Sequence, residues 1–491
     1  MHSCREKVEK AVAERVAAGF VTDVIVIFRP EYRRAQQRIL EARESEARAE
    51  KIRVLEAAML KSLDAVAGAL LKRGRTRAVP SVPVSLATSA MNEAPGSGQM
   101  VPSWLTNSVS LLASPDWINR LAAHRLVTRI VTNKTEKLAR PFRTQPPAVL
   151  PGPADVAWSL RHLGIPDLWA QGLSGKGVSV GHLDTGVDAA HPDLAGRVAE
   201  WEAFDQFGNA LTGTPRYDSD FHGTHTAGVI AGGSAGGTAI GIAPGARLSC
   251  ALVLPQGSGT TKQIVRGMEW CLARGVDVLN LSLGGSGYNE AYEAAVRHLN
   301  LLGTFSAFSV GNSGIGVTGS PANHRDACAV GALNEQNEVA DFSGGGAFVW
   351  GHNDVYVKPD LCAPGVAIHS SIPTAYVRET GSDPYDDLDG TSMAAPHVSG
   401  TVALLWEAFP DASADQIREA LFATCRPLGP SFHNMHSGRG LIQPLDALRK
   451  LERIVRASSS TRRRHGAPLG TANRVETIGL PKPPPAKVAG N

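Results

Sequence analysis

The sequence of 491 residues has no apolar run close to the roughly 20 residues that a membrane-spanning helix needs, so we expect no membrane span. It also has no excess of charge of one sign, since 49 Lys and Arg residues face 46 Asp and Glu residues. The resulting formal net charge of +3 gives no electrostatic signature of nucleic-acid binding, and we expect no nucleic-acid partner.

Cysteine is scarce and scattered along the chain. The six cysteines include no C-x-x-C pair, which indicates isolated core thiols rather than a zinc site or a disulfide framework. The first residues are charged and amphipathic, without the apolar stretch of a signal peptide. Both absences favour a cytoplasmic location, with secretion as the alternative. The cysteines are Cys4, Cys250, Cys271, Cys328, Cys362 and Cys425.

Hydrophobic residues make up 43% of the chain, which is enough for a large core, and this length predicts two or three domains. From about residue 178 to residue 332, apolar strands alternate with helical segments. This alternation is typical of a mainly parallel, doubly wound sheet, so we expect the largest domain to be an α/β protein.

Residues 1–133 predict a separate small domain of strands and helices. Ser114-Pro115 has the pattern of a helix N-terminus, with a capping residue and a proline at the first helical position. A longer, charged helix is expected before it, because its apolar residues recur at three- and four-residue steps. The expected strands are 21–28, 104–113 and 127–131, and the long helix is 31–72.

Composition predicts three further boundaries. Residues 134–153 are basic and rich in proline, with little to bury, so we expect a linker there that is open to proteolytic processing. The main α/β domain is expected at 154–450. Residues 451–491 contain runs of serine, arginine and proline and predict a disordered basic tail.

The chemistry of the chain centres on one serine. Ser392 directly precedes an apolar run, which predicts a position at the N-terminus of a buried helix, where N–H groups and the helix dipole favour negative charge. Pro396 is expected near the helix start, where its missing N–H matters least. A serine alone is a poor nucleophile and needs a base and a group that orients the base. Asp184, at the end of a predicted strand, and His222, at the start of a small-residue helix, supply these groups.

The residues around these three side chains resemble the signatures of the subtilisin-like serine proteases, also called subtilases or peptidase family S8. The three segments are Asp184-Thr185-Gly186-Val187, His222-Gly223-Thr224-His225-Thr226-Ala227-Gly228 and Gly390-Thr391-Ser392-Met393-Ala394-Ala395-Pro396-His397. The likeness extends from about Trp158 to Leu448. It implies a three-layer sandwich with a seven-stranded, mainly parallel sheet, and a serine endopeptidase that acts on protein or peptide substrates.

The resemblance assigns roles within the site. Ser392 would attack the peptide carbonyl, His222 would take and return the proton, and Asp184 would orient the imidazole. Asn312 resembles the side chain that stabilises the oxyanion in this family, with the backbone N–H of Ser392 as its partner. The neighbouring His182, His225 and His397 are expected to be structural.

Substrate-binding residues and metals follow from the same resemblance. Ser258 and Gly259 would form the edge that pairs with the substrate, and Ser282, Leu283 and Gly284 would form a wall of the S1 pocket. The mechanism requires no cofactor and no catalytic metal. Asp193 matches a carboxylate that binds structural calcium in relatives, but the companion loop, 233–238, offers few oxygen ligands, so we expect no tight calcium site.

The N-terminal domain resembles the inhibitor-9-like propeptides of these proteases, in particular from Trp104 to Ile130. The implied function is a self-inhibited zymogen whose own N-terminal domain is an intramolecular inhibitor and folding chaperone. The long helix exceeds the usual propeptide. This leaves a second hypothesis, a protease-fold regulator or binding protein whose N-terminal domain stays docked. A third is an esterase or transacylase that uses the same site.

Overall fold

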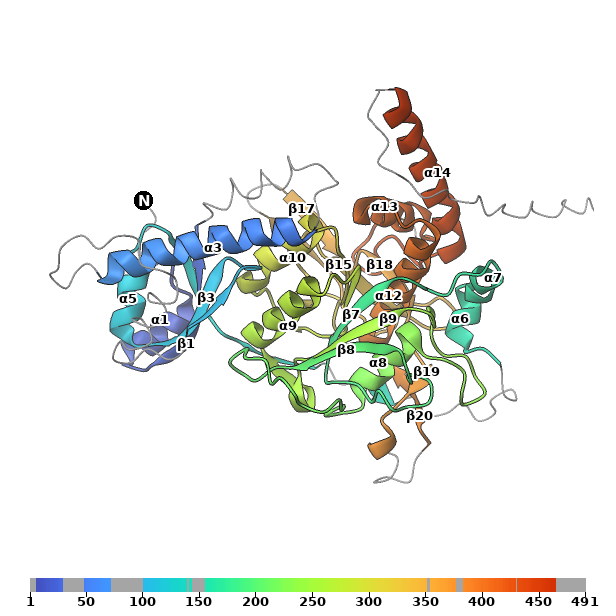
Figure 1. Cartoon of the computed structure of the whole chain (residues 1–491), viewed down its shortest axis with the longest axis horizontal. Helices are drawn as coiled ribbons and strands as arrows, with labels where there is room; N and C mark the ends of the chain where they lie inside the picture. Colours follow the sequence, from blue (N-terminus) through green and yellow to red (C-terminus); the bar gives the residue numbers. More distant parts are fainter. Residues whose placement is uncertain are drawn as a thin grey trace, which may run out of the picture.

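A computed structural model describes residues 6–29, 48–71, 100–138, 141–143, 155–350, 354–376, 383–429 and 431–464. The N-terminal strands and helices, blue to cyan in Figure 1, lie on one side of a larger α/β body. Residues 31–47 of the predicted long helix, Cys4 and most of the predicted linker lie outside the described residues.

The larger body is built on a seven-stranded sheet in the order β18-β15-β13-β11-β7-β9-β8, and every neighbouring pair is parallel. Most residues of its strands are buried because the sheet is covered on both faces. The predicted parallel, doubly wound α/β fold is therefore confirmed. The strands are β7 (Ser179–Asp184), β8 (Val198–Ala203), β9 (Arg247–Leu252), β11 (Val278–Leu281), β13 (Phe305–Ser309), β15 (Cys328–Leu333) and β18 (Leu361–Pro364).

Helices on the two faces complete three layers (Figure 1). One face packs against α8 and α12, with α6, α7, α13 and α14 beyond them, and the other packs against α9 and α10. The bounds are α6 (Trp158–His162), α7 (Ile165–Trp169), α8 (His222–Ala231), α9 (Thr261–Ala273), α10 (Glu293–Leu301), α12 (Thr391–Ala408), α13 (Ala414–Thr424) and α14 (Pro444–Arg464), with short 3-10 helices η1 (Pro255–Gly257) and η2 (Glu290–Tyr292).

The N-terminal domain is an antiparallel sheet of order β2-β3-β1-β4 with its own apolar core. Ser114 caps α5 as predicted, because its side chain accepts the N–H of Trp117. The strand predicted at 104–113 begins too early: residues 104–107 form a turn in which Asn107 has a φ of 49°. The elements are β1 (Thr22–Phe28), β2 (Val101–Ser103), β3 (Ser108–Ala113), β4 (Val127–Thr132), α1 (Lys10–Ala17), α3 (Arg48–Leu71) and α5 (Pro115–Ala122).

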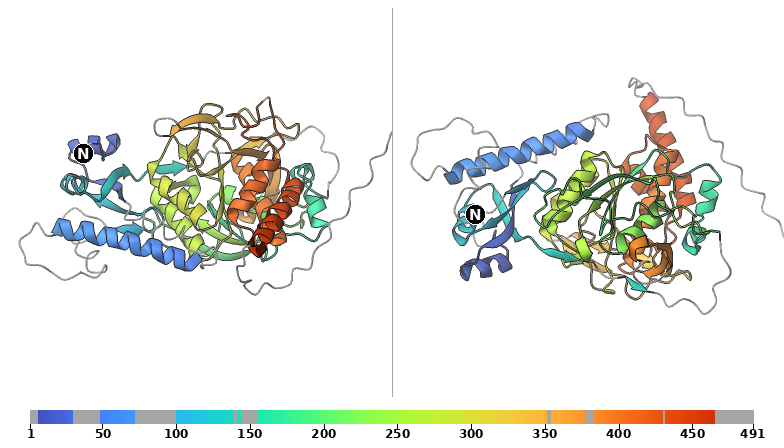
Figure 2. Two further views of the ribbon diagram at one scale, coloured as in Figure 1. Left: turned by 90° about the horizontal axis from the view of Figure 1, so that it is seen from above. Right: turned by 60° about the horizontal axis from the view of Figure 1, so that its bottom comes forward.

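Helix α3 runs along the N-terminal sheet and onto the main body (Figure 2). Leu55 and Met59 are buried in the same apolar cluster as residues of α9 and α10. At the start of α3, the guanidinium of Arg48 donates to the carbonyls of Val276, Leu302 and Gly303, which end or follow α9 and α10. A cation at helix C-termini offsets the negative end of the helix dipole, so α3 ties the two domains together.

The expectation that the linker has little to bury is wrong for the described part of 134–153, where Glu136 and Leu138 are buried. β5 (Thr135–Lys137) pairs with β10 (Ser258–Thr260), and β6 (Phe142–Arg143) pairs with β20 (Tyr385–Asp389). The edges of β10 and β20 offer unpaired backbone groups, and the linker residues satisfy them. Other short pairs are β12 (Gly285–Ser286) with β14 (Gly319–Ser320), β16 (Gly346–Trp350) with β17 (Asp354–Lys358), and β19 (Ile368–Ser371) with β20.

The tail prediction is wrong for residues 451–464, which form the second half of α14. Leu448 and Leu451 are buried in the main core, and Ile454 and Val455 pack against it, so this stretch has an apolar face that the expected tail lacked. Residues 465–491 lie outside the described residues.

The described residues contain no helix that is both long and apolar enough to cross a membrane. The five described cysteines are buried and free, which agrees with the prediction of isolated core thiols: Cys250, Cys271, Cys328, Cys362 and Cys425.

Candidate active site

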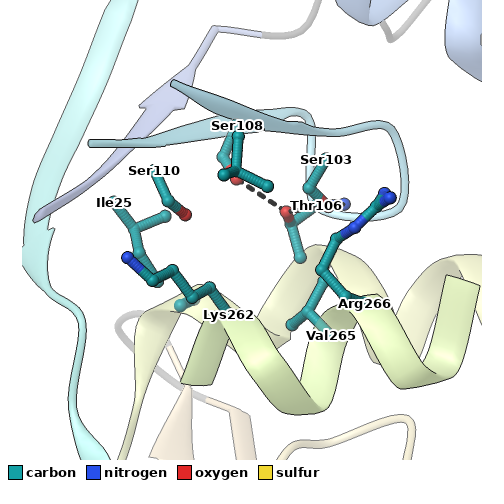
Figure 3. Close-up of a pocket in the computed structure, with 10 residues that line it drawn as sticks. Ile25, Ser103, Thr106, Ser108, Ser110, Lys262, Val265 and Arg266 are labelled. Atoms are coloured by element: carbon teal, nitrogen blue, oxygen red, sulfur yellow. Dashed lines mark hydrogen bonds between the residues drawn. The ribbon is translucent and has the colours of Figure 1, made fainter. Parts of the chain in front are cut away.

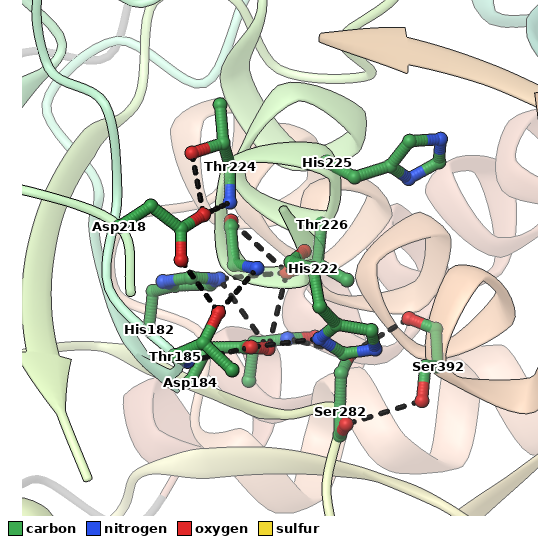
Figure 4. Close-up of polar contacts among 12 residues, drawn as sticks. His182, Asp184, Thr185, Asp218, His222, Thr224, His225, Thr226, Ser282 and Ser392 are labelled. Atoms are coloured by element: carbon green, nitrogen blue, oxygen red, sulfur yellow. Dashed lines mark hydrogen bonds and ion pairs between the residues drawn. The ribbon is translucent and has the colours of Figure 1, made fainter. Parts of the chain in front are cut away.

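The predicted catalytic side chains come together at the carboxyl ends of the parallel strands (Figure 4). Asp184 is the last residue of β7, His222 is the first residue of α8, and Ser392 is the second residue of α12. All three are buried. Carboxyl ends of parallel strands and helix N-termini meet at this edge of an α/β fold, so residues far apart in sequence become neighbours.

Asp184 and His222 form a short hydrogen bond. The Oδ1 atom of Asp184 lies 2.7 Å from Nδ1 of His222, and the same oxygen accepts the backbone N–H of Thr185. Burial by itself raises the pKa of Asp184 and lowers the pKa of His222. The mutual attraction and the hydrogen bonds outweigh burial, so the pKa of Asp184 is below and the pKa of His222 above its ordinary value. This pairing keeps a carboxylate ready to stabilise an imidazolium.

The main chain of Ser392 is held by Ser282. Pro396 lies in the second turn of α12 rather than in the first turn, so the expectation for its position is wrong. Without an N–H at Pro396, the carbonyl of Ser392 lacks its helical donor. The hydroxyl of Ser282, just beyond the end of β11, donates to that carbonyl at 2.7 Å. The bond fixes the first turn of α12 against the sheet.

The hydroxyl of Ser392 donates to the carbonyl of Ser282 at 3.1 Å. Among the described residues, Nε2 of His222 has no hydrogen-bond partner, although it is buried. Figure 4 draws Ser392 beside the imidazole ring. The hydroxyl of Ser392 is therefore not hydrogen-bonded to Nε2 in this arrangement, and such bonds commonly tighten only when substrate is bound.

The Asn312 side chain is oriented by Thr391. Its Oδ1 accepts the backbone N–H of Thr391 at 2.9 Å and the hydroxyl of Thr391 at 2.8 Å. These two bonds fix the orientation of the amide, and a Cβ at Gly390 would lie 3.3 Å from Nδ2. The N–H donor of Asn312 therefore faces the start of the helix that carries Ser392, where an oxyanion donor is needed.

Of the predicted substrate-binding residues, Ser258 and Gly259 lie beside strand β5 of the same chain. Ser258 and Gly259 pair with Lys137 and Glu136 in antiparallel register. On the other side, β5 also lies against β12, which begins directly after Gly284. Leu283 is buried in the core cluster of α9 and α10. The edge predicted to hold a peptide is therefore filled by the N-terminal part of the chain.

Asp218 is a site residue that the sequence analysis missed. Its carboxylate accepts hydrogen bonds from the hydroxyl of Thr185 and from the N–H and hydroxyl of Thr224, so it joins the end of β7 to the start of α8 (Figure 4). Burial raises the pKa of Asp218 to about 6, although these hydrogen bonds act against the shift. The available signal was an acidic residue shortly before a helix that begins with His222.

The other histidines of the motifs are structural, as predicted. His182 contacts the hydroxyl of Thr226, His225 contacts the carbonyl of Ile368, and His397 contacts the carbonyl of Met393. Burial lowers the pKa of His182 to about 4, that of His225 to about 3 and that of His397 to about 4. Each ring is therefore neutral at physiological pH.

The surroundings of Asp193 do not fit a calcium ion. Its Oδ1 accepts the backbone N–H of Ala235, and its Oδ2 accepts the hydroxyl of Tyr385 at 2.7 Å. Calcium requires about six to eight oxygen ligands, whereas hydrogen-bond donors face this carboxylate. Within the described ranges, no group of three or more His, Cys, Asp or Glu side chains is placed to hold a metal ion.

Comparisons with known proteins agree with this geometry. Residues 175–440 match the subtilase family, Peptidase_S8. The chain is 31% identical over 381 residues to bacillopeptidase F of Bacillus subtilis, which covers 70% of this chain and 26% of that protein. It is 37% identical over 278 residues to subtilisin DY of Bacillus licheniformis, and 37% identical over 296 residues to subtilisin Savinase of Lederbergia lenta. The chain thus spans about a quarter of bacillopeptidase F but 91% and 99% of the two subtilisins.

Proposed function

We propose, from the premise that this chain belongs to the subtilase family and is a subtilisin-like serine endopeptidase, that it is made as a self-inhibited zymogen with Asp184, His222 and Ser392 as its catalytic triad. The observation that carries the triad is the buried 2.7 Å contact between Asp184 and His222 beside Ser392. Its substrates are proteins or peptides.

In the proposed reaction, Oγ of Ser392 attacks the peptide carbonyl while Nε2 of His222 takes the hydroxyl proton. The negative charge on the tetrahedral oxygen is stabilised by Nδ2 of Asn312 and the backbone N–H of Ser392. His222 then gives the proton to the leaving amine, and an acyl-enzyme remains. Water, with His222 again as the base, hydrolyses the ester and restores Ser392.

Self-inhibition is supported by the path of the linker. The chain pairs with β10 at Thr135–Lys137 and with β20 at Phe142–Arg143. β20 leads directly into Gly390 and the helix that carries Ser392. We therefore assign the processed bond to the stretch between Leu138 and Phe142, where the chain passes from one strand to the other. Ala139 and Arg140, within this stretch, lie outside the described residues.

Release of the N-terminal domain after processing is supported by the polar part of the surface between the domains, which also includes an apolar cluster of Ile25, Val131 and Ala291. Figure 3 shows hydroxyl side chains of the N-terminal domain over α9, and the space that they line is about 10 Å³. Polar interfaces are typical of partners that separate, whereas permanent interfaces are more apolar. The residues that face each other include Ser103, Thr106, Ser108, Ser110, Lys262 and Arg266.

One observation favours the alternative function, a protease-fold regulator whose N-terminal domain stays docked. Helix α3 is buried against α9 and α10 through Leu55 and Met59, and Arg48 adds three hydrogen bonds to main-chain carbonyls. These contacts are apolar and charge-assisted, so they oppose release. The two functions differ in whether the domain leaves after the chain is cut.

The decisive experiment compares the intact masses of the purified full chain and of Ser392→Ala. We expect the wild type to lose a fragment that ends between Leu138 and Phe142, and Ser392→Ala to keep its full length. A fluorophosphonate probe should label only the wild type, and size-exclusion chromatography then shows whether the fragment leaves. Equal full-length masses without labelling would contradict the zymogen proposal and support the regulator.

Two finer points accompany the proposal. We expect catalysis to need no cofactor, because every step uses side chains and water. The cytoplasmic location stays a prediction that is supported by the free, buried cysteines, with secretion as the alternative.

A further inference from the structure

The side chain of Glu136 is buried in the cleft between β10 and β12 that strand β5 fills, although glutamate is ordinarily exposed. Glu136 is the central residue of β5, opposite Gly259, and its exposed fraction is 5%. Its Oε1 accepts hydrogen bonds from Nδ2 of Asn289 at 2.9 Å and from the hydroxyl of Thr261 at 3.3 Å. A buried carboxylate with two neutral donors indicates a pocket shaped for this side chain.

Asn289 is held in place as the main donor. Its backbone N–H donates to the hydroxyl of Ser320 at 2.8 Å, and its carbonyl contacts His324. Its Oδ1 accepts the N–H of Ala291, which caps the 3-10 helix η2. These bonds leave Nδ2 directed at Glu136 and at the hydroxyl of Thr261. The donor is therefore preorganised and needs no rearrangement to bind an acceptor.

Gly285 provides the space for the carboxylate. A Cβ atom at this position would lie 1.5 Å from Oε2 of Glu136. The backbone of Gly285 is not in the left-handed region, so any residue could adopt its conformation. Space for the side chain of β5, rather than backbone freedom, is what this glycine supplies.

We infer that Thr261, Gly285 and Asn289 form a subsite that selects a Glu or Gln side chain at the substrate residue that pairs with Gly259. The inference rests on the proposed function, because β5 is taken to lie where a substrate strand lies. Both side chains reach the donors with an acceptor oxygen. Asp is one methylene shorter, and Leu would leave one buried N–H of Asn289 unpaired, whereas the hydroxyl of Thr261 can still donate to the carbonyl of Lys134.

The first test uses peptides that copy residues 134–143, with Glu, Gln, Asp or Leu at the position of Glu136. The self-processed full chain should cleave the Glu and Gln peptides with kcat/KM values within a few fold of each other. The Asp and Leu peptides should be cleaved at least about tenfold less efficiently. Equal rates for all four peptides would overturn the subsite while leaving the endopeptidase intact. If no peptide is cleaved, the proposed function fails and the second test decides the subsite.

Asn289→Asp separates the two accepted side chains. The new carboxylate still caps η2 but repels Glu, whereas a Gln carboxamide can donate to it. The ratio of kcat/KM for Gln over Glu should therefore rise at least about tenfold, and because both values come from one protein, partial misfolding cancels. Gly285→Ala should lower kcat/KM for the Glu peptide and for the Gln peptide by similar factors relative to the unsubstituted protein. An unchanged ratio in Asn289→Asp would contradict the assignment.

The second test needs no catalytic activity. In the Ser392→Ala full chain, hydrogen exchange is measured at the N–H of Leu138, which donates to Gly257 across the cleft. Glu136→Leu should speed this exchange at least about tenfold, Glu136→Gln should not, and Asn289→Asp should be rescued by Glu136→Gln. Equal exchange in all variants would overturn the subsite, whatever the outcome of the peptide assay.

Discussion

The hydroxyl of Ser282 donates to the main-chain carbonyl of Ser392 at 2.7 Å, where Pro396 leaves the helix without a donor. Ser392 is thus held in place by a residue that lies 110 positions earlier in the chain. We expect Ser282→Ala to lower kcat more than it changes KM, because the first turn of α12 loses its anchor. The free energy of unfolding should fall by about 1–3 kcal/mol, the range for an unsatisfied buried carbonyl.

The control for this variant is Thr401→Ala. Thr401 is buried on the same helix, and its hydroxyl donates to the carbonyl of His397 rather than to the main chain of Ser392. It should lose comparable stability with little change in kcat. A similar kcat loss in both variants would show that Ser282 has no special role in positioning Ser392.

The acid limb of the pH–activity profile should report His222. Although burial lowers its pKa, the charges of Asp184, Asp220 and Asp218 raise it above the ordinary value. A general base must be unprotonated, so kcat/KM should rise with pH through a pKa above 6.5. Asp220→Asn should shift this limb to lower pH, because one charge that favours the imidazolium is removed. An unshifted limb would mean that the charge of Asp220 does not act on the base.

Asp218 should make stability depend on pH in the opposite sense from an ordinary ion-paired carboxylate. Its folded pKa, about 6, exceeds the ordinary value of 3.8, so its contribution is present below pH 3.8 and is lost as pH rises through 6. Relative to Asp218→Asn, the wild type should lose on the order of 3 kcal/mol of unfolding free energy between these limits. Denaturant unfolding at several pH values measures the difference, and a constant difference would contradict the shift.

Removal of calcium should not change the thermal stability of the protein, since hydrogen-bond donors already occupy both carboxylate oxygens of Asp193. We expect the same thermal midpoint in EDTA and in excess calcium. Tyr385→Phe should lower the free energy of unfolding by about 1.5–3 kcal/mol through loss of one hydrogen bond to a carboxylate. A midpoint that rises with calcium in the wild type would show that the ion displaces these donors.

Arg48→Ala should speed the release of the N-terminal domain. The guanidinium is the group that joins α3 to the carbonyls at the ends of α9 and α10, and burial lowers its pKa although Asp277 acts in the opposite direction. The lag before peptidase activity appears should shorten several fold. Arg53→Ala, on the exposed side of the same helix and paired with Glu50, is the matched control. Equal lags would remove α3 from the control of activation.

The sequence predicted most of the fold and where Asp184, His222 and Ser392 lie on their strands and helices, because those signals are local. Asp184 follows a buried apolar strand and Ser392 precedes a buried helix, and a parallel sheet brings such ends together. The tail, in contrast, looked polar from its composition. The apolar face of helix α14 consists of residues such as Leu451 and Ile454, which pack against the core.

What the sequence could not predict depends on partners far along the chain. Residues 135–137 have no strand signal of their own, and they are extended because β10 offers them an edge. Similarly, nothing near Tyr385 indicates that its hydroxyl meets Asp193, which lies 192 positions away. The hydrogen bonds of Asp218 also depend on the packing of β7 against α8, since their donors are Thr185, which follows β7, and Thr224 of α8.

The covalent continuity of β5 with the cleft that it fills has a kinetic consequence. While the chain is intact, the occupying strand is present at an effective concentration set by the tether, and dilution cannot remove it. In the proposed zymogen, cutting within one molecule would proceed at a rate independent of protein concentration. Once the bond is broken, occupancy would follow the dissociation constant of the fragment. A single hydrolysis would therefore convert a protein insensitive to its own concentration into one whose specific activity grows on dilution.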